Sequence, residues 1–409
     1  MLVIPLTTTV ITYAGTFFNV AVIILLRDPA FFNVREGEIG RVTNDIIFYS
    51  QLTQILFTLA AGYLYDILGR RVTVVATMLP GALIVMLVPT VAPSILLLIV
   101  IRIFSSFGIW TLGCHPFIND YVSKETRGRA VAIQAAGFIL GDLLTFAVML
   151  NLTRDMSPYG RFQTYGLSLI LLTVLFAALI KEPTDRQVTR EQHPLDRARE
   201  LSRQMWELCK SDVLYPICLL GSMSARIIMF LFSTFMMLYV TSEIPDQHLA
   251  ETVIQKVNIV AVLATLLIVV PAGKMADRLT ARMLIPFAFT LTSVALVLFQ
   301  FLPPLSRYAS STASIVPLVA IVSLIMTGSV FAATCIESLY AKNLPKDIRG
   351  VMNGLQSFAG ALGGLWFTKL GGYVYDVYGP RSPFLLVAMV NLVFVVFVLW
   401  NGLSGNFRH

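Results

Sequence analysis

The stretch Gly62-Tyr-Leu-Tyr-Asp66-Ile-Leu-Gly69-Arg70-Arg71 joins two long apolar segments of this chain. A degraded copy, Gly273-Lys-Met-Ala-Asp277-Arg278-Leu-Thr-Ala-Arg282, joins two apolar segments in the second half. In both copies an aspartate follows a glycine by four residues and arginines come next, which is typical of a cytoplasmic turn between membrane-spanning helices. The recurrence predicts that one structural unit was duplicated within a polytopic transporter.

The composition predicts a membrane protein. The 409-residue chain is 56% hydrophobic and only 13% charged, whereas soluble domains carry about 25% charged residues. A soluble core cannot hide this much apolar surface, so we expect a bilayer to cover much of it. We assign the formal charge of +7 to cytoplasmic loops rather than to nucleic-acid binding. The four cysteines form neither a disulfide framework nor a metal-ligand spacing, so no metal and no cofactor are expected.

Apolar segments of membrane-spanning length recur along the chain. A transmembrane helix needs roughly 20 apolar residues, and Pro, Gly and charged residues separate twelve such segments: 2–26, 43–65, 72–92, 95–119, 130–151, 163–181, 213–240, 253–274, 282–302, 314–340, 352–374 and 383–402. The predicted fold is therefore an all-α membrane protein with twelve transmembrane helices in two pseudo-symmetric six-helix bundles. The bundles cover residues 1–181 and 213–409.

A cytoplasmic linker, residues 182–212, separates the two predicted bundles. Apolar residues from Leu195 to Leu208 recur at helical spacing beside arginines, which predicts an amphipathic helix on the inner membrane surface or under the bundle. Lys and Arg are concentrated in this linker and in alternate loops. The positive-inside rule then places both termini on the cytoplasmic or matrix side. Nothing in the sequence identifies the membrane, so the plasma membrane and the mitochondrial inner membrane both stay open.

Other features also repeat at matching places in the two halves. Arg127-Gly128 and Arg349-Gly350 open the fifth and eleventh segments, and glycine clusters follow within them. Small residues let membrane helices approach closely. The glycine clusters are Gly137-x-x-x-Gly141 and Gly360-x-x-Gly363-Gly364, and the stretches Ser157-Pro-Tyr-Gly-Arg161-Phe and Gly379-Pro-Arg381-Ser-Pro-Phe follow corresponding helices.

With the loop motif, these repeats resemble the major facilitator superfamily over essentially the whole chain. The resemblance implies two six-helix halves, a central cavity at mid-membrane and alternating access by rocking of the halves. One departure is Gly141-Asp142, because the family's antiporter signature usually has Gly-Pro there. No subfamily with a known substrate is identified by these motifs.

We interpret the loop residues as a conformational latch. A carboxylate is stabilised at a helix N-terminus by unpaired N–H groups and the helix dipole. Asp66 is therefore expected to face the start of the eleventh helix, and Asp277 the start of the fifth. The alternative is that these are solvated turns whose charges only set topology. The predicted latch consists of Gly62, Asp66, Gly69, Arg70, Arg71, Asp277 and Arg278.

Charged residues within the spans are candidates for the solute site, because each costs roughly 2.5–3.5 kcal/mol on insertion scales and needs a cavity or a partner. Arg226 stands near the middle of the seventh span with no carboxylate at its depth in its own half. A solute contact is expected for it, the alternatives being snorkelling or capping of carbonyls. Arg102 and Asp142 stand at similar depth on neighbouring spans, so they either form a salt bridge or line the solute site. Glu337 is interpreted as an inner-mouth charge.

In the family layout the first, fourth, seventh and tenth helices line the cavity. The predicted substrate-binding residues combine cations, amides, a carboxylate and a phenol: Arg226, Arg102, Asp142, Tyr13, Asn19, Gln54 and Asn258. Such a set suits a small polar or anionic solute better than a bulky cation.

The chain is thus predicted to be a secondary active transporter, a symporter or antiporter, with a proton as the candidate coupling ion. It would work as a monomer or as a subunit of a membrane assembly. No nucleotide-binding, metalloprotease or serine-hydrolase motif occurs, so an enzyme is not expected. The alternative is a transporter-fold protein that acts as a structural subunit or receptor in a larger membrane assembly.

Overall fold

The computed structural model describes residues 3–113, 127–180, 203, 206–207, 209–210, 212–278, 281–305, 315–343 and 349–404. Each of the twelve predicted segments is helical over most of its described part, and no strand occurs among the described residues. The predicted all-helical fold class is therefore confirmed. The chain divides into two compact units, one formed by Met1–Gln187 with Met237–Ile259 and the other by Val188–Met236 with Val260–His409.

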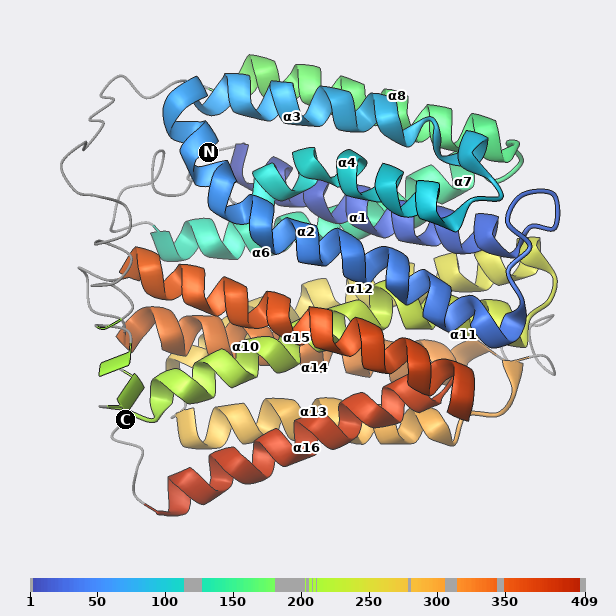
Figure 1. The fold of residues 1–409 in the computed structure, drawn as a ribbon. Helices are drawn as coiled ribbons and strands as arrows, with labels where there is room; N and C mark the ends of the chain where they lie inside the picture. Colours follow the sequence, from blue (N-terminus) through green and yellow to red (C-terminus); the bar gives the residue numbers. More distant parts are fainter. Residues whose placement is uncertain are drawn as a thin grey trace. The chain divides into compact units, whose positions relative to one another are not determined.

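The first unit is organised around its N-terminal helix (Figure 1). Its main helices are α1 (Val3–Arg27), α2 (Ile39–Leu68), α3 (Arg70–Val85), α4 (Ile95–Gly113), α6 (Arg127–Leu143) and α8 (Pro158–Leu179), with 3-10 turns η1 (Glu36–Glu38) and η2 (Val88–Val91). After α6 the chain continues as a π-helix, η4 (Leu144–Met149), and a short α7 (Leu150–Leu152). Helix α1 packs against α4, α6 and α8, so its polar residues can reach three other helices of the unit.

The second unit contains the remaining helices. They are α10 (Leu214–Phe230), the π-helix η5 (Leu231–Met236), α13 (Ala281–Gln300), α14 (Val316–Asn343), α15 (Arg349–Tyr378) and α16 (Ser382–Leu403). Helix α10 packs against α14 and α15, while α13 packs against α14 and α16 (Figure 1). Two further elements, α11 (Met237–Glu243) and α12 (Gln247–Arg278), follow η5, and the first unit takes in α11 and the start of α12.

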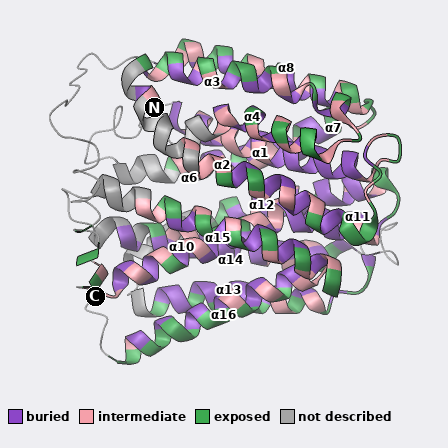
Figure 2. Cartoon of the chain, in the orientation of Figure 1, coloured by how far each residue is buried: buried purple, intermediate pink, exposed green. Residues whose placement is uncertain are grey.

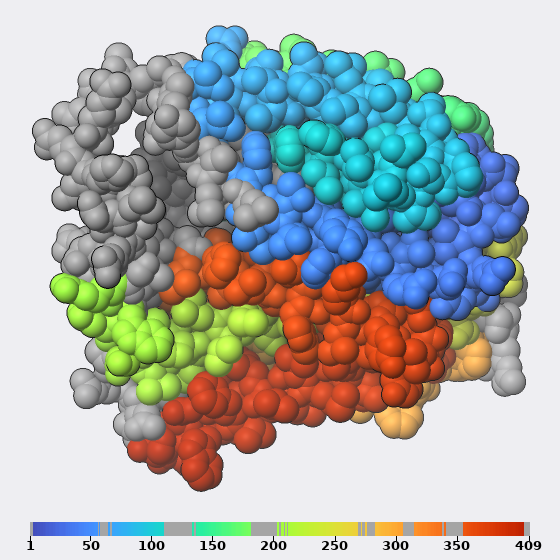
Figure 3. All heavy atoms as spheres, viewed as in Figure 1, coloured from blue at the N-terminus to red at the C-terminus, as the bar shows by residue number. Residues whose placement is uncertain are grey.

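Large apolar side chains cover the outer faces of many helices. Leu171, Leu267 and Trp400 are 75%, 77% and 73% exposed. Figure 2 shows exposed and buried residues alternating along α8 and α16, and Figure 3 shows how side chains of α2, α3 and α4 form one surface of the first unit. Seven helices in the described part are long and apolar enough to cross a membrane. Because such surface is stable only against hydrocarbon, the chain is an integral, multi-pass membrane protein.

Glycines mark equivalent helix contacts in the two units. A Cβ on Gly141 of α6 would lie 2.5 Å from the carbonyl oxygen of Thr9 on α1. A Cβ on Gly363 of α15 would lie 2.7 Å from the carbonyl oxygen of Met223 on α10. Neither backbone leaves room for a larger residue, so the interpretation that the matching glycine clusters let helices approach closely is confirmed.

The loop motif forms the turn between α2 and α3. Gly69 has a φ of 91°, a backbone conformation that favours glycine. Nη1 of Arg70 donates a hydrogen bond to the carbonyl oxygen of Tyr65 at 2.8 Å, which satisfies the last turn of α2. The side chains of Asp66, Asp277 and Arg278 lie outside the described residues, as do most of the amphipathic segment 195–208 and the sequence 182–202. The latch and the bundle boundaries therefore stay predictions.

Candidate functional site

The polar face of α1 connects two charged residues of the first unit. Oγ1 of Thr16 donates to Oδ1 of Asp142 on α6 at 3.0 Å. One turn further along α1, Oδ1 of Asn19 accepts a hydrogen bond from Nη2 of Arg102 on α4 at 3.2 Å. The structure therefore brings three of the predicted site residues, Asn19, Arg102 and Asp142, to one cluster around α1.

Tyr13 extends this cluster toward α8. Its hydroxyl forms a hydrogen bond with Oγ of Ser168, and its ring lies edge-on to Tyr165 with centroids 5.7 Å apart. The Tyr165 hydroxyl donates to the carbonyl oxygen of Ala14 at 2.7 Å. Sequence reasoning did not select Tyr165 or Ser168, although their spacing of three residues would have shown that both lie on one face of the sixth span.

Arg102 is buried but incompletely hydrogen-bonded. Its guanidinium lies over the Phe18 ring, 4.0 Å from the centroid, and it interacts electrostatically with Tyr165. Only 8% of the residue is exposed. Its Nε and Nη1 have no hydrogen-bond partner in the part of the chain that the structure describes. A buried charge normally has its donors satisfied, because an unmet donor costs free energy. The cluster is therefore incomplete without a further acceptor.

The expected salt bridge between Arg102 and Asp142 is wrong for this structure. Both residues are described, and no ion pair joins them. The reason is the position of α1, which packs against both α4 and α6 and supplies a separate partner to each charge. Depth along neighbouring spans is thus a poor guide to pairing when a third helix lies between them.

Arg226 stands in the second unit, on α10, with an exposed side chain. A Cβ on Gly360 of α15 would lie 3.5 Å from its Nε. One turn before Arg226, Oγ of Ser222 accepts a hydrogen bond from Nε2 of Gln356 at 2.9 Å. Arg226 also interacts electrostatically with Glu337 of α14. The interpretation that Arg226 has no carboxylate at its own depth in its half stays a prediction, because Glu337 forms no ion pair with it among the described residues.

The remaining predicted site residues are Asn258 and Gln54. The amide of Asn258 on α12 is buried and donates to the carbonyl oxygen of Ile254, one turn earlier in the same helix, at 2.9 Å. Gln54 is half-buried on α2. A role for either in solute binding stays a prediction.

A buried ion pair at the predicted outer end was not anticipated. Nη1 and Nη2 of Arg161 donate to Oε1 and Oε2 of Glu251 at 3.2 and 3.3 Å, and the two side chains are only 6% and 1% exposed. Nε of Arg161 also donates to the carbonyl oxygen of Thr153. This pair joins α8 to the start of α12 within the first unit. The sequence does place opposite charges at the predicted outer ends of two spans, but nothing in it shows that Arg161 and Glu251 pair.

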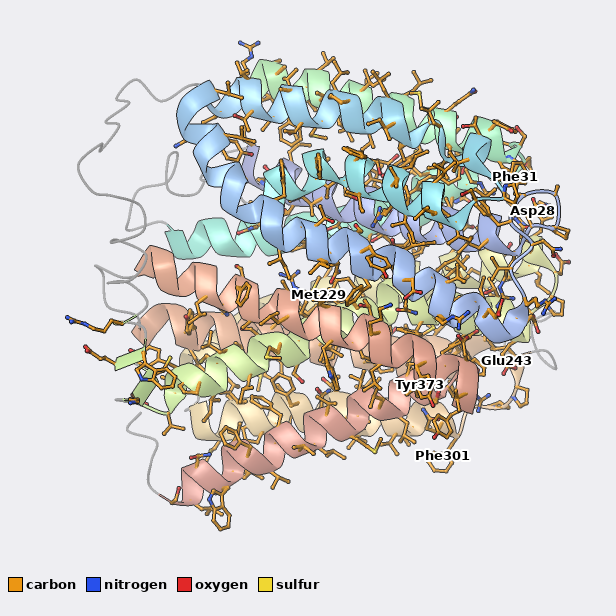
Figure 4. The ribbon with its side chains drawn as sticks, viewed as in Figure 1. Asp28, Phe31, Met229, Glu243, Phe301 and Tyr373 are labelled. Carbon is orange, nitrogen blue, oxygen red and sulfur yellow. The ribbon has the colours of Figure 1, made fainter. Side chains whose placement is uncertain are left out.

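A pocket of about 380 Å³ adjoins this ion pair. Its lining includes Arg161, Arg154, His248 and Asp28, the last of which Figure 4 labels in the turn after α1. In the described part of the chain, no group of three or more His, Cys, Asp or Glu residues could hold a metal ion. The lining residues lie at the predicted outer surface and do not include Arg102, so the pocket is separate from the Arg102 cluster.

Comparison with known proteins defines the class. The family model described as Major Facilitator Superfamily matches residues 6–368 and, in a second match, residues 245–403. The chain belongs to the major facilitator superfamily, whose members are membrane transporters and not enzymes. The crystal structure of a D-xylose–proton symporter is similar, with a TM-score of 0.71, 13% sequence identity and coverage of 97% of this chain and 96% of that one. At this identity the likeness shows the shared fold.

Two relatives carry names that refer to an organelle. Magnetosome protein MamH of Paramagnetospirillum magneticum is 20% identical over 385 residues, covering 90% of this chain and 84% of MamH. Magnetosome protein MamZ of the same organism is 24% identical over 410 residues, covering 94% of this chain and 60% of MamZ. This chain therefore spans about 60% of the length of MamZ.

Proposed function

We propose that this protein is a secondary active transporter that binds a small, polar, anionic solute and moves it by alternating access. The observation that carries the proposal is Arg102, whose buried guanidinium has two nitrogens without an acceptor among the described residues. A solute oxyanion is the acceptor that such a group binds best, because the planar guanidinium presents parallel donors to a carboxylate or phosphate.

The surroundings of Arg102 support binding rather than a purely structural role. Phe18 lies beneath the guanidinium plane, and Asn19 accepts a hydrogen bond from Nη2, so the guanidinium is held in one orientation. Preorganised donors bind a ligand with less loss of conformational entropy than mobile ones. Tyr13 lies on α1, and Asp142 lies on α6, which packs against α1. We propose that these two residues complete the polar lining of the solute site.

Arg226 is proposed as the corresponding group of the second unit, because its charged side chain is exposed and forms no ion pair with the described residues. Gln54 and Asn258 remain proposed lining residues. We propose a proton as the coupling ion. Asp142, which has a single hydrogen-bond donor and no cation partner among the described residues, can hold it.

Alternating access requires contacts that close each end in turn. At the predicted cytoplasmic end, the proposed latch is the loop motif with its second copy: Gly62, Asp66, Gly69, Arg70, Arg71, Asp277 and Arg278. Opening of that end would break the contacts there.

Uptake into proteoliposomes tests the proposal. Labelled inorganic phosphate, dicarboxylates, amino acids and sugars would be offered to the wild type and to Arg102→Lys, which keeps the charge but loses the planar fork. We expect the wild type to take up at least one anionic class. In Arg102→Lys this uptake should fall about tenfold or more, which corresponds to a loss of about 1.4 kcal/mol of binding free energy. Arg154→Lys, at the predicted outer surface, is the matched control. Normal uptake by Arg102→Lys would contradict the proposal.

A structural or receptor role in a larger membrane assembly is the competing proposal. The observation in its favour is that the two relatives are named for the magnetosome rather than for a solute. In that case the magnetosome membrane would be the site of action, and purified protein would bind none of the offered solutes. Binding of an anion that depends on Arg102 would exclude this alternative.

A further inference from the structure

The pocket of about 380 Å³ lies where three long helices of the first unit begin or end. Helix α1 ends at Arg27, α8 begins at Pro158 and α12 begins at Gln247. Each of them contains an apolar stretch long enough to cross a membrane, and all of the lining residues belong to the first unit. The ends of membrane-spanning helices lie at the level of the lipid headgroups. The pocket is therefore placed where a headgroup can enter it.

The charged side chains of the pocket do not neutralise one another. Nη2 of Arg154 donates a hydrogen bond to the carbonyl oxygen of His248 at 3.3 Å, and Arg154 forms no ion pair with the described residues. The carboxylate of Asp155 has neither an ion pair nor a hydrogen bond within that part of the chain. Oδ1 of Asp28 accepts a hydrogen bond from the backbone N–H of Ala30 at 2.9 Å. One guanidinium and two carboxylates are thus available to a ligand.

This combination favours a ligand that carries both signs of charge. Arg161 also lines the pocket, but Glu251 and backbone carbonyls already accept from its donors. A simple anion would meet the carboxylates of Asp28 and Asp155, and a simple cation would meet Arg154, so each would be repelled by part of the lining. A phosphate joined to a primary ammonium group can instead place each charge against an opposite one.

Apolar side chains make up the rest of the lining and its rim. Met156, which lines the pocket, is 38% exposed, and the neighbouring Tyr159 is 45% exposed. The Tyr159 ring contacts Phe31, which Figure 4 labels together with Asp28, with centroids 5.8 Å apart. Tyrosine is enriched at membrane–water interfaces. A ligand with hydrocarbon chains can therefore lay them along this rim. The apolar wall consists of Ala21, Ile24, Leu25 and Phe162.

We propose that this pocket binds the headgroup of an ethanolamine-type phospholipid, with its phosphate on Arg154 and its primary ammonium group on Asp155. The site is separate from the Arg102 cluster, so the inference does not depend on the proposed function. A primary ammonium group donates hydrogen bonds to carboxylates. The quaternary ammonium group of a choline headgroup has no N–H to donate, and a glycerol headgroup has no positive charge. The pocket therefore prefers the ethanolamine lipid to both.

Thermal unfolding of the purified full chain in detergent micelles tests the preference. Dioctanoyl phospholipids with ethanolamine, choline or glycerol headgroups share the same tails, and glycerophosphoethanolamine is the ethanolamine headgroup without tails. We expect the ethanolamine lipid to reach half-maximal stabilisation at a concentration about tenfold lower than the other two lipids, a ratio equivalent to ~1.4 kcal/mol. Glycerophosphoethanolamine should need a concentration at least about tenfold higher than the ethanolamine lipid, because it buries no tails.

Variants assign the two contacts. In Asp155→Asn the preference for ethanolamine over choline should fall to about threefold or less, whereas Asp155→Glu, which keeps the charge, should retain it. Arg154→Gln should weaken all three lipids by about tenfold, and Arg154→Lys should bind them nearly as the wild type does, because a lysine also binds phosphate. The controls of equal charge change are Glu38→Gln and Arg41→Gln, an exposed pair 3.7 Å apart outside the pocket. Neither control should alter the preference.

The opposite results overturn the inference. Equal binding of the three lipids would exclude the ammonium contact, and a preference that is unchanged in Asp155→Asn would exclude Asp155 as its cause. If glycerophosphoethanolamine acts at the same concentration as the ethanolamine lipid, the ligand is a soluble phosphate ester and the lipid assignment is wrong. If none of the probes stabilises the protein, the pocket is not a headgroup site. Solute uptake through the Arg102 cluster is measured separately and stays open to its own test.

Discussion

Arg161 and Arg102 are the same kind of side chain at nearly the same burial, 5% and 8% exposed, yet their surroundings are opposite. Each nitrogen of Arg161 donates to an acceptor, either a carboxylate oxygen of Glu251 or a backbone carbonyl. A single nitrogen of Arg102 donates, to Asn19, and the other two have no partner among the described residues. Among the described residues, every nitrogen of the first arginine has an acceptor, whereas two nitrogens of the second have none.

The difference separates an arginine that holds the fold from one that is available to a ligand. Arg161 connects the turn before α8 with α12, because it donates to the carbonyl oxygen of Thr153 and to the carboxylate of Glu251. In the second unit, Arg381 at the corresponding repeat donates to the carbonyl oxygens of Gln300 and Leu302, so the repeated stretches share a structural arginine. Among the described residues, the Arg102 side chain contacts one amide and one aromatic ring and no carboxylate or backbone carbonyl. Burial alone therefore does not identify a binding residue, and the unmet donors are the reason that a ligand role is proposed for Arg102.

The largest effect is expected from Arg161→Met. This change leaves the Glu251 carboxylate buried and uncompensated, and breaking a buried ion pair costs about 3–5 kcal/mol. Denaturant-induced unfolding in detergent micelles would measure the loss. Adding Glu251→Leu should recover most of it, because no charge then stays buried. A loss below about 1 kcal/mol in the single variant would contradict a structural role for Arg161.

Arg102→Met should behave in the opposite way. It removes a buried charge that has no counter-ion within the described residues, so the free energy of unfolding should stay the same or rise by about 1–4 kcal/mol. The same unfolding assay applies, with Arg161→Met as the reference. If Arg102→Met were as destabilised as Arg161→Met, Arg102 would be structural and the comparison would fail.

A smaller change sharpens the description of the Arg102 site. Phe18→Leu keeps an apolar side chain but removes the ring face below the guanidinium, a contact worth about 0.5–2 kcal/mol. The contact is present with and without solute, so we expect solute affinity to fall only as far as the guanidinium loses its orientation, by at most about 30-fold, while the fold is kept. Phe162→Leu is the matched control, since Phe162 packs edge-on against Phe18 rather than under the charge.

The smallest effect is a coupling energy expected to be near zero. A double-mutant cycle with Arg102→Ala and Asp142→Ala should be additive within about 0.5 kcal/mol, because separate residues of α1 bond to the two charges. A direct salt bridge, one of the two alternatives left open by the sequence, would instead give partial recovery in the double variant. A favourable coupling well above that limit would restore the direct salt bridge.

The sequence predicted the helical architecture well, because hydrophobic length and glycine spacing are local signals. The close packing at Gly141 and Gly363 followed from such spacing. The turn at Gly69 was also predicted from a local signal, the loop motif, and the positive φ of Gly69 is a conformation that favours the glycine found there.

The site was only partly predictable, because side-chain pairing depends on which helix lies between two others. Arg102 and Asn19, both predicted site residues, are hydrogen-bonded to each other, but the direct Arg102–Asp142 salt bridge, one of two alternatives, was wrong because α1 separates them. Glu337 was placed at the inner mouth, and its interaction with Arg226 was missed. Long charged side chains span more than one helical turn, so depth counted along a helix cannot fix their partners.

Equilibrium binding of the solute found in the uptake screen tests the central claim most directly. The measurement compares the wild type, Arg102→Lys and Arg161→Lys at equal concentrations of folded protein. The account predicts that Arg102→Lys weakens binding by tenfold or more, equivalent to about 1.4 kcal/mol, while folded Arg161→Lys binds as the wild type does. Unchanged affinity in Arg102→Lys would contradict the claim that the unmet donors of Arg102 bind the solute.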